Sequence, residues 1–458
     1  MTTPHAYKAW GVVTFRTCTQ KDVYSMDVQD LQQYFETRQS RRRVLQQLGA
    51  LASVGLALDA CSSTASTHKS LTPVPSGPGS IESIKHIVIA CQENRSFDTY
   101  FGHYEKAGNF GVPAGYSQPD GKGGTATPHK FHILDTKDIK HDWQTIHSEW
   151  NKGKMDGFYR TDGASSLGYY DRSDIPYYYG LADNFTLCGN YFCYQLGPTL
   201  PNRLALWAGT TGGITQNHKL PQGSLDFPTI IDLLEDHGIS WKFYTLGLLG
   251  LGSTPEIEFI NAMPSFKRWY KDKRLYNSEE TFFSDMKAGA LPQVTFVISA
   301  AFYSEHPPLN IVLGEKKIAS VVNALIQSPL WSSSAFIMTY DEGGGYFDHV
   351  PPPQVDAYGM GMRVPTFVVS PWAKRGYVSG QLYEHSSILK FVERRFGLPS
   401  LASVNHRFNT STPALNNDAA TGNSGPPAPP RDGLAQIGDF YEAFDFKQNP
   451  NYNPNLST

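Results

Sequence analysis

The sequence predicts an α/β protein whose central, mostly parallel β-sheet is flanked by helices on both faces. From residue 84 onward, short runs rich in β-branched residues alternate with amphipathic stretches, a pattern typical of βα proteins. The 458 residues are 40% hydrophobic and 18% charged, a composition that supports a large core and excludes a disordered or long coiled-coil protein. No internal repeat is visible, so solenoids and propellers are disfavoured.

Five segments have the composition of strands in this sheet. They are IKHIVIACQ (84–92), ISWKFY (239–244), VTFVIS (294–299), SAFIMTY (334–340) and PTFVVSPW (365–372). Helices are predicted over 229–238, 314–327 and 387–396. In the second helix Ile318, Val321, Val322, Leu325 and Ile326 form an apolar stripe for packing on the sheet.

Residues 1–61 have the pattern of an export leader. Leu48 to Leu58 is uncharged and follows three arginines, and the run SRRRVL resembles the twin-arginine export pattern. Cys61 lies where a lipoprotein would be acylated, which predicts a secreted or envelope-anchored protein. An ordinary buried helix is the alternative, and the long stretch before the arginines suggests an over-extended start, with Met26 nearer the true one. We expect a Ser/Thr/Pro/Gly linker over 62–80 and a single domain over 81–458.

Charge and cysteine content exclude several classes of protein. The 39 Lys and Arg residues against 42 Asp and Glu residues give a net charge of -3 without a basic block, so nucleic acid is not an expected partner. The apolar stretch of the leader is shorter than the roughly 20 residues of a membrane-spanning helix. Outside the leader only Cys91, Cys188 and Cys193 remain, too few for a disulfide scaffold; a Cys188–Cys193 bridge and two buried thiols are both open.

Polar residues follow three of the predicted strands. The first strand is followed by Glu93 and Asn94, the third by Ser304, Glu305 and His306, and the fourth by Asp341, Glu342 and three glycines. Because ligands of parallel α/β sheets bind at the carboxyl ends of the strands, these residues should meet at one edge. Two adjacent acids followed by glycines, which let the backbone turn sharply, suit an oxygen-rich metal site. The sequence has no G-x-S-x-G, phosphate-loop, H-E-x-x-H or C-x-x-C motif, which disfavours lipase-type serine hydrolases, P-loop enzymes and zincins.

Several co-linear segments resemble one known family. They are QENRSFDTYFG (92–102), HDWQTIHSEWNKGKMDGF (141–158), LGPTLPNRLALWAGT (196–210), SEHPP (304–308), TYDEGGGYFDHVPPP (339–353) and RVPTFVVSPWAKRGYV (363–378). Together they resemble the bacterial phospholipase C and acid phosphatase family, to which plant non-specific phospholipases C are similar. The resemblance covers nearly the whole chain after the leader, and it implies an alkaline-phosphatase-like fold and a phosphoesterase catalytic domain.

The resemblance also implies roles for individual residues. Metal ligands would be Glu93, Asn94, Asp341 and Glu342, together with Thr199, which would be the nucleophile as well. A threonine hydroxyl is a weak nucleophile until a cation or a base activates it, so this pairing is chemically reasonable. The ligand types suit Ca, Mg or Mn, and Zn remains open.

The resemblance implies further contacts to the substrate. His306, and with less weight His141, would bind the phosphoryl group or protonate the leaving oxygen. Weaker candidates for substrate contact are Arg203, Asn202, Arg95 and His349. For the arginines, ion pairing with nearby carboxylates is an equally good interpretation, and His349 could simply bond a loop. The tyrosines at 169–170 and 177–179 could line a choline or acyl pocket, but a packed loop is the more ordinary interpretation.

The preferred hypothesis is an exported, metal-dependent phospholipase C. It would form a phospho-Thr199 intermediate and release diacylglycerol and a phosphorylated headgroup from a phospholipid, with peripheral membrane contact. The alternatives are an acid phosphatase of broad specificity for phosphomonoesters and, in another class, a surface lipoprotein that binds phosphorylated ligands without turnover.

Overall fold

The structure, a computed structural model, describes residues 78–217, 220–247, 259–404 and 428–456. These residues all fall within one compact unit, Lys69–Ser253 and Ile257–Thr458. The predicted leader, and all of the linker except residues 78–80, lie outside the described residues. No described helix is both long and apolar enough to cross a membrane.

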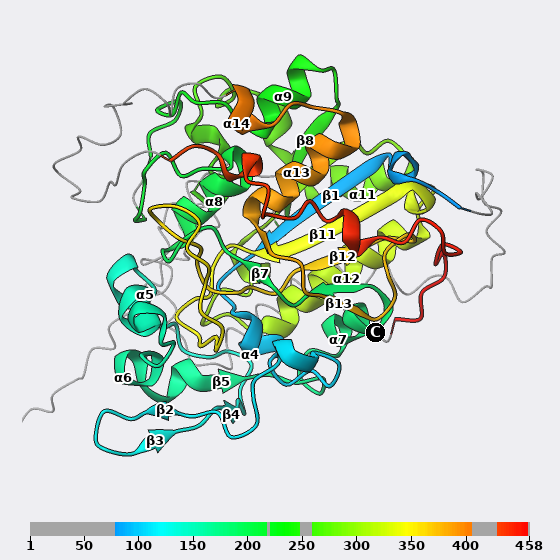
Figure 1. Cartoon of the computed structure of the whole chain (residues 1–458). Helices are drawn as coiled ribbons and strands as arrows, with labels where there is room; N and C mark the ends of the chain where they lie inside the picture. Colours follow the sequence, from blue (N-terminus) through cyan, green and yellow to red (C-terminus); the bar gives the residue numbers. More distant parts are fainter. Residues whose placement is uncertain (1–77, 218–219, 248–258, 405–427, 457–458) are drawn as a thin grey trace, which may run out of the picture. The chain divides into compact units, whose positions relative to one another are not determined.

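An eight-stranded sheet forms the centre of the described domain (Figure 1). Its strands are β1 (His86–Gln92), β6 (Thr186–Cys188), β8 (Trp241–Leu246), β9 (Asn277–Ser278), β10 (Val294–Ser299), β11 (Ser334–Tyr340), β12 (Phe367–Val369) and β13 (Tyr377–Ser379). They lie in the order β13-β6-β12-β11-β1-β10-β8-β9, and of these eight β12 alone runs against the others. In parallel register, Cys91 pairs with Ile298 of β10 and Thr339 of β11, so β1, β10 and β11 end at the same edge.

Helices cover both faces of this sheet. The longer helices of the described residues are α5 (Trp143–Trp150), α7 (Pro176–Asn184), α8 (Thr199–Ala208), α11 (Glu279–Lys287), α12 (Ile311–Gln327) and α13 (His385–Phe396). The shorter ones are α4 (Phe97–Phe101), α6 (Phe158–Asp162), α9 (Ile230–Asp236) and α14 (Leu401–Val404). In Figure 1, α8 and α13 lie on one face and α7 and α12 on the other. The α/β class with a mostly parallel sheet is therefore confirmed.

Short two-residue strands pair outside the main sheet. They are β2 (Gln118–Pro119) with β3 (Thr125–Ala126), β4 (His129–Lys130) with β5 (Gly168–Tyr169), and β7 (Tyr191–Phe192) with β14 (Tyr383–Glu384). Two of these pairs, β2–β3 and β4–β5, lie in the stretch of chain between α4 and α7, which also contains helices α5 and α6.

Local sequence explains where the main elements begin and end. The strands predicted over 294–299 and 334–340 are confirmed in full, whereas the segment 365–372 narrows to β12 because prolines at 365 and 371 bound it. Helix α12 begins three residues before the prediction because the Asn310 side chain accepts the Val312 N–H as its N-cap. Of the predicted stripe, Ile326 is half-buried and the other four residues are fully buried.

The cysteines and tyrosines that the sequence left open lie in the core. Cys91, Cys188 and Cys193 are buried free thiols, so there is no Cys188–Cys193 bridge. Of the tyrosines at 169–170 and 177–179, all but Tyr169 are buried, as a packed segment requires, but those at 177–179 lie in helix α7 rather than in a loop.

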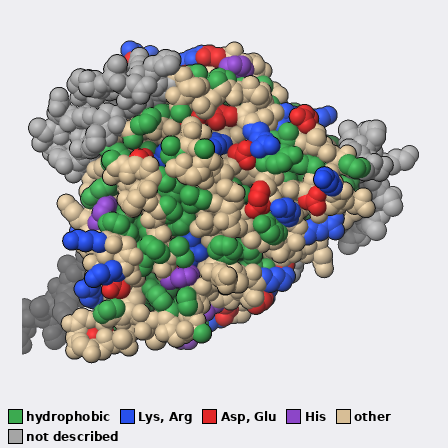
Figure 2. All heavy atoms as spheres, viewed as in Figure 1, with side chains coloured by type: hydrophobic (Ala, Val, Ile, Leu, Met, Phe, Trp, Pro, Cys, Tyr) green, Lys and Arg blue, Asp and Glu red, His purple; other side chains and the backbone are tan. Residues whose placement is uncertain are grey.

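On the face seen in Figure 2, Lys and Arg side chains are interspersed with Asp and Glu side chains. That face therefore offers no basic field for a nucleic-acid backbone.

Candidate active site

The residues that follow β1, β10 and β11 meet at one edge of the sheet, as predicted. The Glu93 N–H donates to the Ser304 carbonyl at 2.8 Å, and the Asn94 N–H donates to Asp341 Oδ1 at 3.2 Å. Asn94 adopts a left-handed backbone with φ of 62°. A Cβ on Gly344 would lie 2.6 Å from the Asn94 carbonyl oxygen, so the glycine permits this close approach.

Asp341 and Glu342 form the acidic side of the site, and both are fully buried. The Glu342 N–H donates to Asp341 Oδ1 at 2.8 Å, and the Gly344 N–H donates to Glu342 Oε2 at 2.6 Å. Burial raises the pKa of Glu342 to about 8; nearby His141 opposes this shift and Asp341 adds to it. Without a compensating cation, Glu342 therefore holds a proton at neutral pH.

Arg203 links α8 to this acidic side. Its Nε lies 3.1 Å from Asp341 Oδ2 and its Nη2 lies 3.3 Å from Glu93 Oε1, and the guanidinium is fully buried. It also donates to the Cys91 and Gln92 carbonyls. Arg203 therefore forms ion pairs with carboxylates, which was one of the two interpretations that the sequence allowed. Through these pairs it holds Glu93 and Asp341, two of the predicted metal ligands, in place.

Thr199 is the first residue of α8, one helical turn before Arg203 and on the same side of the helix. It is 4% exposed, and among the described residues its hydroxyl has no hydrogen-bond partner. Asn202 fixes the loop before it, because its Nδ2 donates to the Gly197 carbonyl at 2.9 Å and the Pro198 carbonyl at 3.0 Å. The structure thus leaves the Thr199 hydroxyl free for chemistry and uses Asn202 for support.

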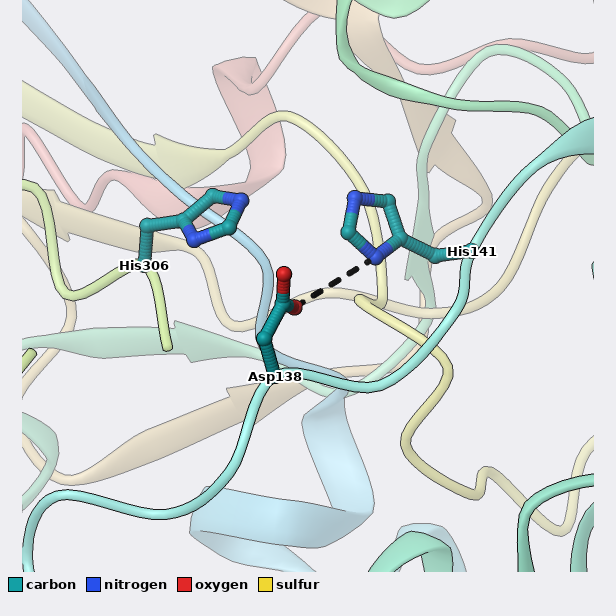
Figure 3. A group of neighbouring side chains, drawn as sticks. All are labelled: Asp138, His141 and His306. Atoms are coloured by element: carbon teal, nitrogen blue, oxygen red, sulfur yellow. Dashed lines mark ion pairs between the residues drawn. The ribbon is translucent and has the colours of Figure 1, made fainter. Parts of the chain in front are cut away.

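His141 and His306 form the other side of the site, with rings whose centroids are 5.7 Å apart. Figure 3 shows them facing each other above the carboxylate of Asp138, which lies 3.8 Å from His141 Nδ1. The Nδ1 atom of His141 contacts the Ile139 carbonyl at 2.6 Å, and that of His306 contacts the Pro307 carbonyl. Because carbonyls only accept, both Nδ1 atoms carry a proton, and a neutral ring then has its lone pair on Nε2.

The pKa values of the two histidines are shifted in opposite directions. Burial lowers the pKa of His306. Burial would also lower the pKa of His141, but the carboxylates of Glu342 and Asp138 outweigh it, so the net shift is upward. The His141 Nε2 atom lies 3.6 Å from Glu342 Oε1. His141 is therefore the more readily protonated of the pair.

The Asn94 side chain lies between the carboxylates and the histidines, and its contacts test whether a cation fits. Its oxygen faces Glu342 Oε1 at 3.1 Å and Asp341 Oδ1 at 3.2 Å, so three acceptor oxygens converge. Turning the amide over would satisfy both carboxylates, but its oxygen would then need protons from His306 Nε2 at 2.8 Å and His141 Nε2 at 3.2 Å. While the histidines are neutral, a cation among the oxygens would reconcile these contacts, and without a cation the proton on Glu342 relieves one of them. The residues fit a divalent cation with oxygen ligands.

Sequence comparison places this site in a known family. Residues 84–399, which span all elements from β1 to α13, match the Phosphoesterase family. The chain belongs to this family. The matched residues include every residue of the site described above.

Named relatives of this phosphoesterase are phospholipases. It is 33% identical over 393 residues to "Non-hemolytic phospholipase C" of Burkholderia pseudomallei, covering 69% of this chain and 56% of that protein. It is 32% identical over 448 residues to "Phospholipase C A" of Mycobacterium tuberculosis, covering 83% of this chain and 81% of that protein. The chain thus spans little more than half the length of the first relative. A protein of the alkaline phosphatase superfamily from Vibrio parahaemolyticus is similar with a TM-score of 0.38 and 11% identity, covering 74% of this chain and 73% of that one.

Two of the weaker candidates in the phosphoesterase lie beside the site rather than in it. Arg95 is fully buried and donates from Nη2 to the Glu305 carbonyl at 2.7 Å. His349 Nδ1 lies 2.6 Å from Asp98 Oδ2, and the other oxygen of Asp98 accepts from Arg363 at 2.9 Å. Arg363 also pairs with Asp348 at 2.9 Å, so the two carboxylates beside His349 share one buried arginine.

The sequence did not single out Glu305 as a supporting residue of the phosphoesterase. Glu305 is fully buried, has φ of 72°, and immediately precedes His306. Its carboxylate accepts hydrogen bonds from four side chains of separate elements: Tyr100 (2.6 Å), Tyr340 (2.7 Å), Gln92 (3.0 Å) and Tyr178. No local pattern signals such a set of contacts, because the donors are far apart in the sequence. Glu305 fixes the backbone from which His306 projects.

We expect Glu305→Gln to destabilise the phosphoesterase by about 2–4 kcal/mol, because it weakens charge-assisted bonds and turns an amide N–H₂ toward buried donors. Urea unfolding would measure this loss. Glu315→Gln is the matched control, because Glu315 uses a single oxygen to accept the N–H groups of Tyr177 and Tyr178, and an amide oxygen can do the same. Equal stability of the two variants would contradict the supporting role of Glu305.

Proposed function

We propose that this chain is a divalent-cation-dependent phosphodiesterase of the phospholipase C type, which cleaves phospholipids to diacylglycerol and a phosphorylated headgroup. The observation that carries the proposal is the convergence of Asn94, Asp341 and Glu342 oxygens at one sheet edge with two histidines beside them. The names of the relatives support phospholipids as the substrate class. Export through the predicted leader and acylation of Cys61 remain part of the proposal.

In the proposed mechanism Thr199 is the nucleophile. Its hydroxyl has no hydrogen-bond partner among the described residues and lies at the start of α8, where the positive end of the helix dipole favours an anion. Glu93, Asn94, Asp341 and Glu342 would hold the cation, which would lower the pKa of the hydroxyl and neutralise charge on the phosphoryl oxygens. Attack forms an ester bond between Thr199 and phosphorus, and the bond from phosphorus to the glycerol oxygen breaks. The headgroup stays on phosphorus in this phosphothreonine, and water then breaks the bond from phosphorus to the Thr199 oxygen, which releases the phosphorylated headgroup and restores the hydroxyl.

The histidines would act on the phosphoryl and leaving oxygens. Both rings are anchored through Nδ1, so both present Nε2 toward Asn94 and the interior of the site. His141, with its raised pKa, is suited to hold a proton that binds a phosphoryl oxygen. His306, with its lowered pKa, is neutral with its lone pair on Nε2, so it would accept the proton that the Thr199 hydroxyl loses on attack and pass it to the departing glycerol oxygen.

Cation binding should depend on pH through Glu342. The carboxyl holds a proton below its pKa of about 8, and a cation must displace that proton. We therefore expect the affinity for Mn²⁺ or Ca²⁺, measured by calorimetry, to rise from pH 6 to about pH 8 and then level off. The cation-free protein should lose stability over the same range, because burial of the ionised carboxylate is unfavourable. The rise in melting temperature on adding cation should therefore be larger at pH 8 than at pH 6, and an affinity independent of pH would contradict this account.

Two chromogenic substrates test the substrate class. The protein should hydrolyse p-nitrophenyl phosphocholine, a phosphodiester, with higher kcat/KM than p-nitrophenyl phosphate, a phosphomonoester, and chelation should abolish both activities. A preference for the monoester would instead favour the acid phosphatase. Absence of turnover with either substrate, in the presence of bound cation, would favour a binding protein.

A further inference from the structure

A cavity of about 860 Å³ lies between the side of α12, the start of α7 and the segment 130–134. Its lining residues on α12 recur at helical spacing, from position 312 to position 323, so the cavity follows about 16 Å of one side of this helix. None of the residues that line it belongs to the active site, so the proposed mechanism gives it no role. Its volume is typical of sites for small molecules. We call it the α12 cavity.

Glu315 is the one buried charged side chain among the residues that line the α12 cavity, and it is 3% exposed. Its Oε1 atom accepts the N–H groups of Tyr177 at 2.8 Å and Tyr178 at 3.2 Å. The other carboxylate oxygen, Oε2, has no hydrogen-bond partner among the described residues. Burial raises the pKa of Glu315 to about 7. A positive charge against Oε2 would favour the ionised carboxylate, so this oxygen marks a position for a cation.

The lysines of the α12 cavity do not supply that charge. Lys130 Nζ is held by Asp171 at 2.7 Å and by Asp174 at 3.2 Å. Lys316 is exposed, and within the part of the chain that the structure describes it forms no ion pair with Glu315. An empty cavity therefore leaves Glu315 to bind a proton, and a cationic ligand would take the place of that proton.

The wall around Glu315 decides which kind of cation fits. It is largely apolar or aromatic, with Phe131, Leu134, Pro176, Tyr177, Val312 and Ala319. A hard metal ion needs about six oxygen ligands, and this wall offers one buried carboxylate oxygen without a partner. An organic ammonium ion needs a single carboxylate, and its carbon groups gain from contact with apolar and aromatic side chains.

We propose that the α12 cavity binds an organic ammonium ion, with its charge against Glu315 Oε2 and its carbon groups on the apolar wall. This inference goes beyond the proposed function and does not depend on phospholipid hydrolysis. The same ammonium chemistry occurs in free amino alcohols, such as choline, and in their phosphate esters. These two sources are separated by titration with choline and with phosphocholine.

The test is calorimetric titration of the full chain with choline, and Glu280→Gln is the matched control because Glu280 is an exposed acid outside the cavity. We expect choline to bind the parent and the control alike and to bind Glu315→Gln at least about tenfold more weakly. The neutral carbon analogue of choline, in which a tert-butyl group replaces the trimethylammonium group, should bind the parent at least about tenfold more weakly than choline.

A second variant tests the cavity without touching the carboxylate. Ala319 lines the cavity one helical turn after Glu315, so Ala319→Phe would fill the space beside Oε2 and should also weaken choline binding at least about tenfold. The melting temperature of Glu315→Gln should match that of the parent, because an amide oxygen still accepts both N–H groups. Phosphocholine bound with the same dependence on Glu315 would assign the site to the phosphorylated headgroup, and dependence for choline alone would assign it to the free amino alcohol.

Three results would overturn the inference. One is the absence of choline binding by the parent protein. Another is equal choline affinity in Glu315→Gln, Ala319→Phe and the Glu280→Gln control, which would place choline elsewhere on the protein. The third is equal affinity for choline and its neutral analogue, which would make the cavity an apolar site. Failure of the parent to hydrolyse p-nitrophenyl phosphocholine would contradict the proposed function and leave the outcome of these titrations unchanged.

Discussion

Thr199→Ala is expected to reduce kcat on p-nitrophenyl phosphocholine by roughly 10⁴–10⁶-fold, the loss seen when a nucleophile is removed from an enzyme that works through a covalent intermediate. The reason is chemical rather than structural. The hydroxyl of Thr199 has no hydrogen-bond partner among the described residues, so its removal leaves no buried group unpaired. We expect the free energy of unfolding to change by less than about 1 kcal/mol.

Two further variants separate the role of the Thr199 hydroxyl from its packing. Thr199→Ser keeps the hydroxyl and should retain much of the activity. Thr210→Ala removes a buried hydroxyl just beyond the end of α8, which donates to the Ala428 carbonyl at 2.8 Å; it should cost stability without comparable loss of kcat. Substantial turnover by correctly folded, cation-loaded Thr199→Ala would exclude Thr199 as the nucleophile.

Asp341→Asn is expected to have the second-largest effect. Asp341 contacts the Asn94 and Glu342 N–H groups through one oxygen and Arg203 through the other. Removing its charge takes away a predicted cation ligand and leaves the buried guanidinium with Glu93 as its remaining carboxylate partner. We expect cation affinity to fall by at least about 100-fold and the free energy of unfolding to fall by about 3–5 kcal/mol.

Calorimetry with Mn²⁺ and urea unfolding measure these two losses separately. Asp236→Asn is the matched control, because Asp236 pairs with Arg268 at 2.8 Å while its side chain is 56% exposed. A surface pair of this kind contributes less than about 1 kcal/mol, and it lies outside the site. Unchanged cation affinity in Asp341→Asn would remove this residue from the ligand set.

The sequence was sufficient to predict which strands end at the site. Continuous β-branched runs such as 294–299 and 334–340 are recognisable locally, and the direction of the chain then fixes which residues follow each strand. The strands β6 and β13 escaped notice because each has three residues and depends on its neighbours for pairing. Local pattern is enough for long buried strands but not for short ones.

The supporting residues of the site were harder to predict. From the sequence, Arg203 was equally suited to bind phosphate or to pair with carboxylates, and the structure shows it paired with Asp341 and Glu93. The donors around Glu305 come from four elements, and only the assembled fold brings them together. The leader over residues 1–61, with Cys61, stays a prediction because it lies outside the described residues.

The central claim is that catalysis passes through a phosphate ester on Thr199, and the most direct test is to trap it. Cation-loaded protein is mixed with p-nitrophenyl phosphocholine, quenched in acid during turnover, digested, and mapped by mass spectrometry, with Thr199→Ala treated in parallel. We predict a phosphorylated or phosphocholine-bearing peptide with the modification on Thr199, absent from the variant. Modification of a different residue, or steady turnover by a protein that never carries phosphate on Thr199, would contradict the account.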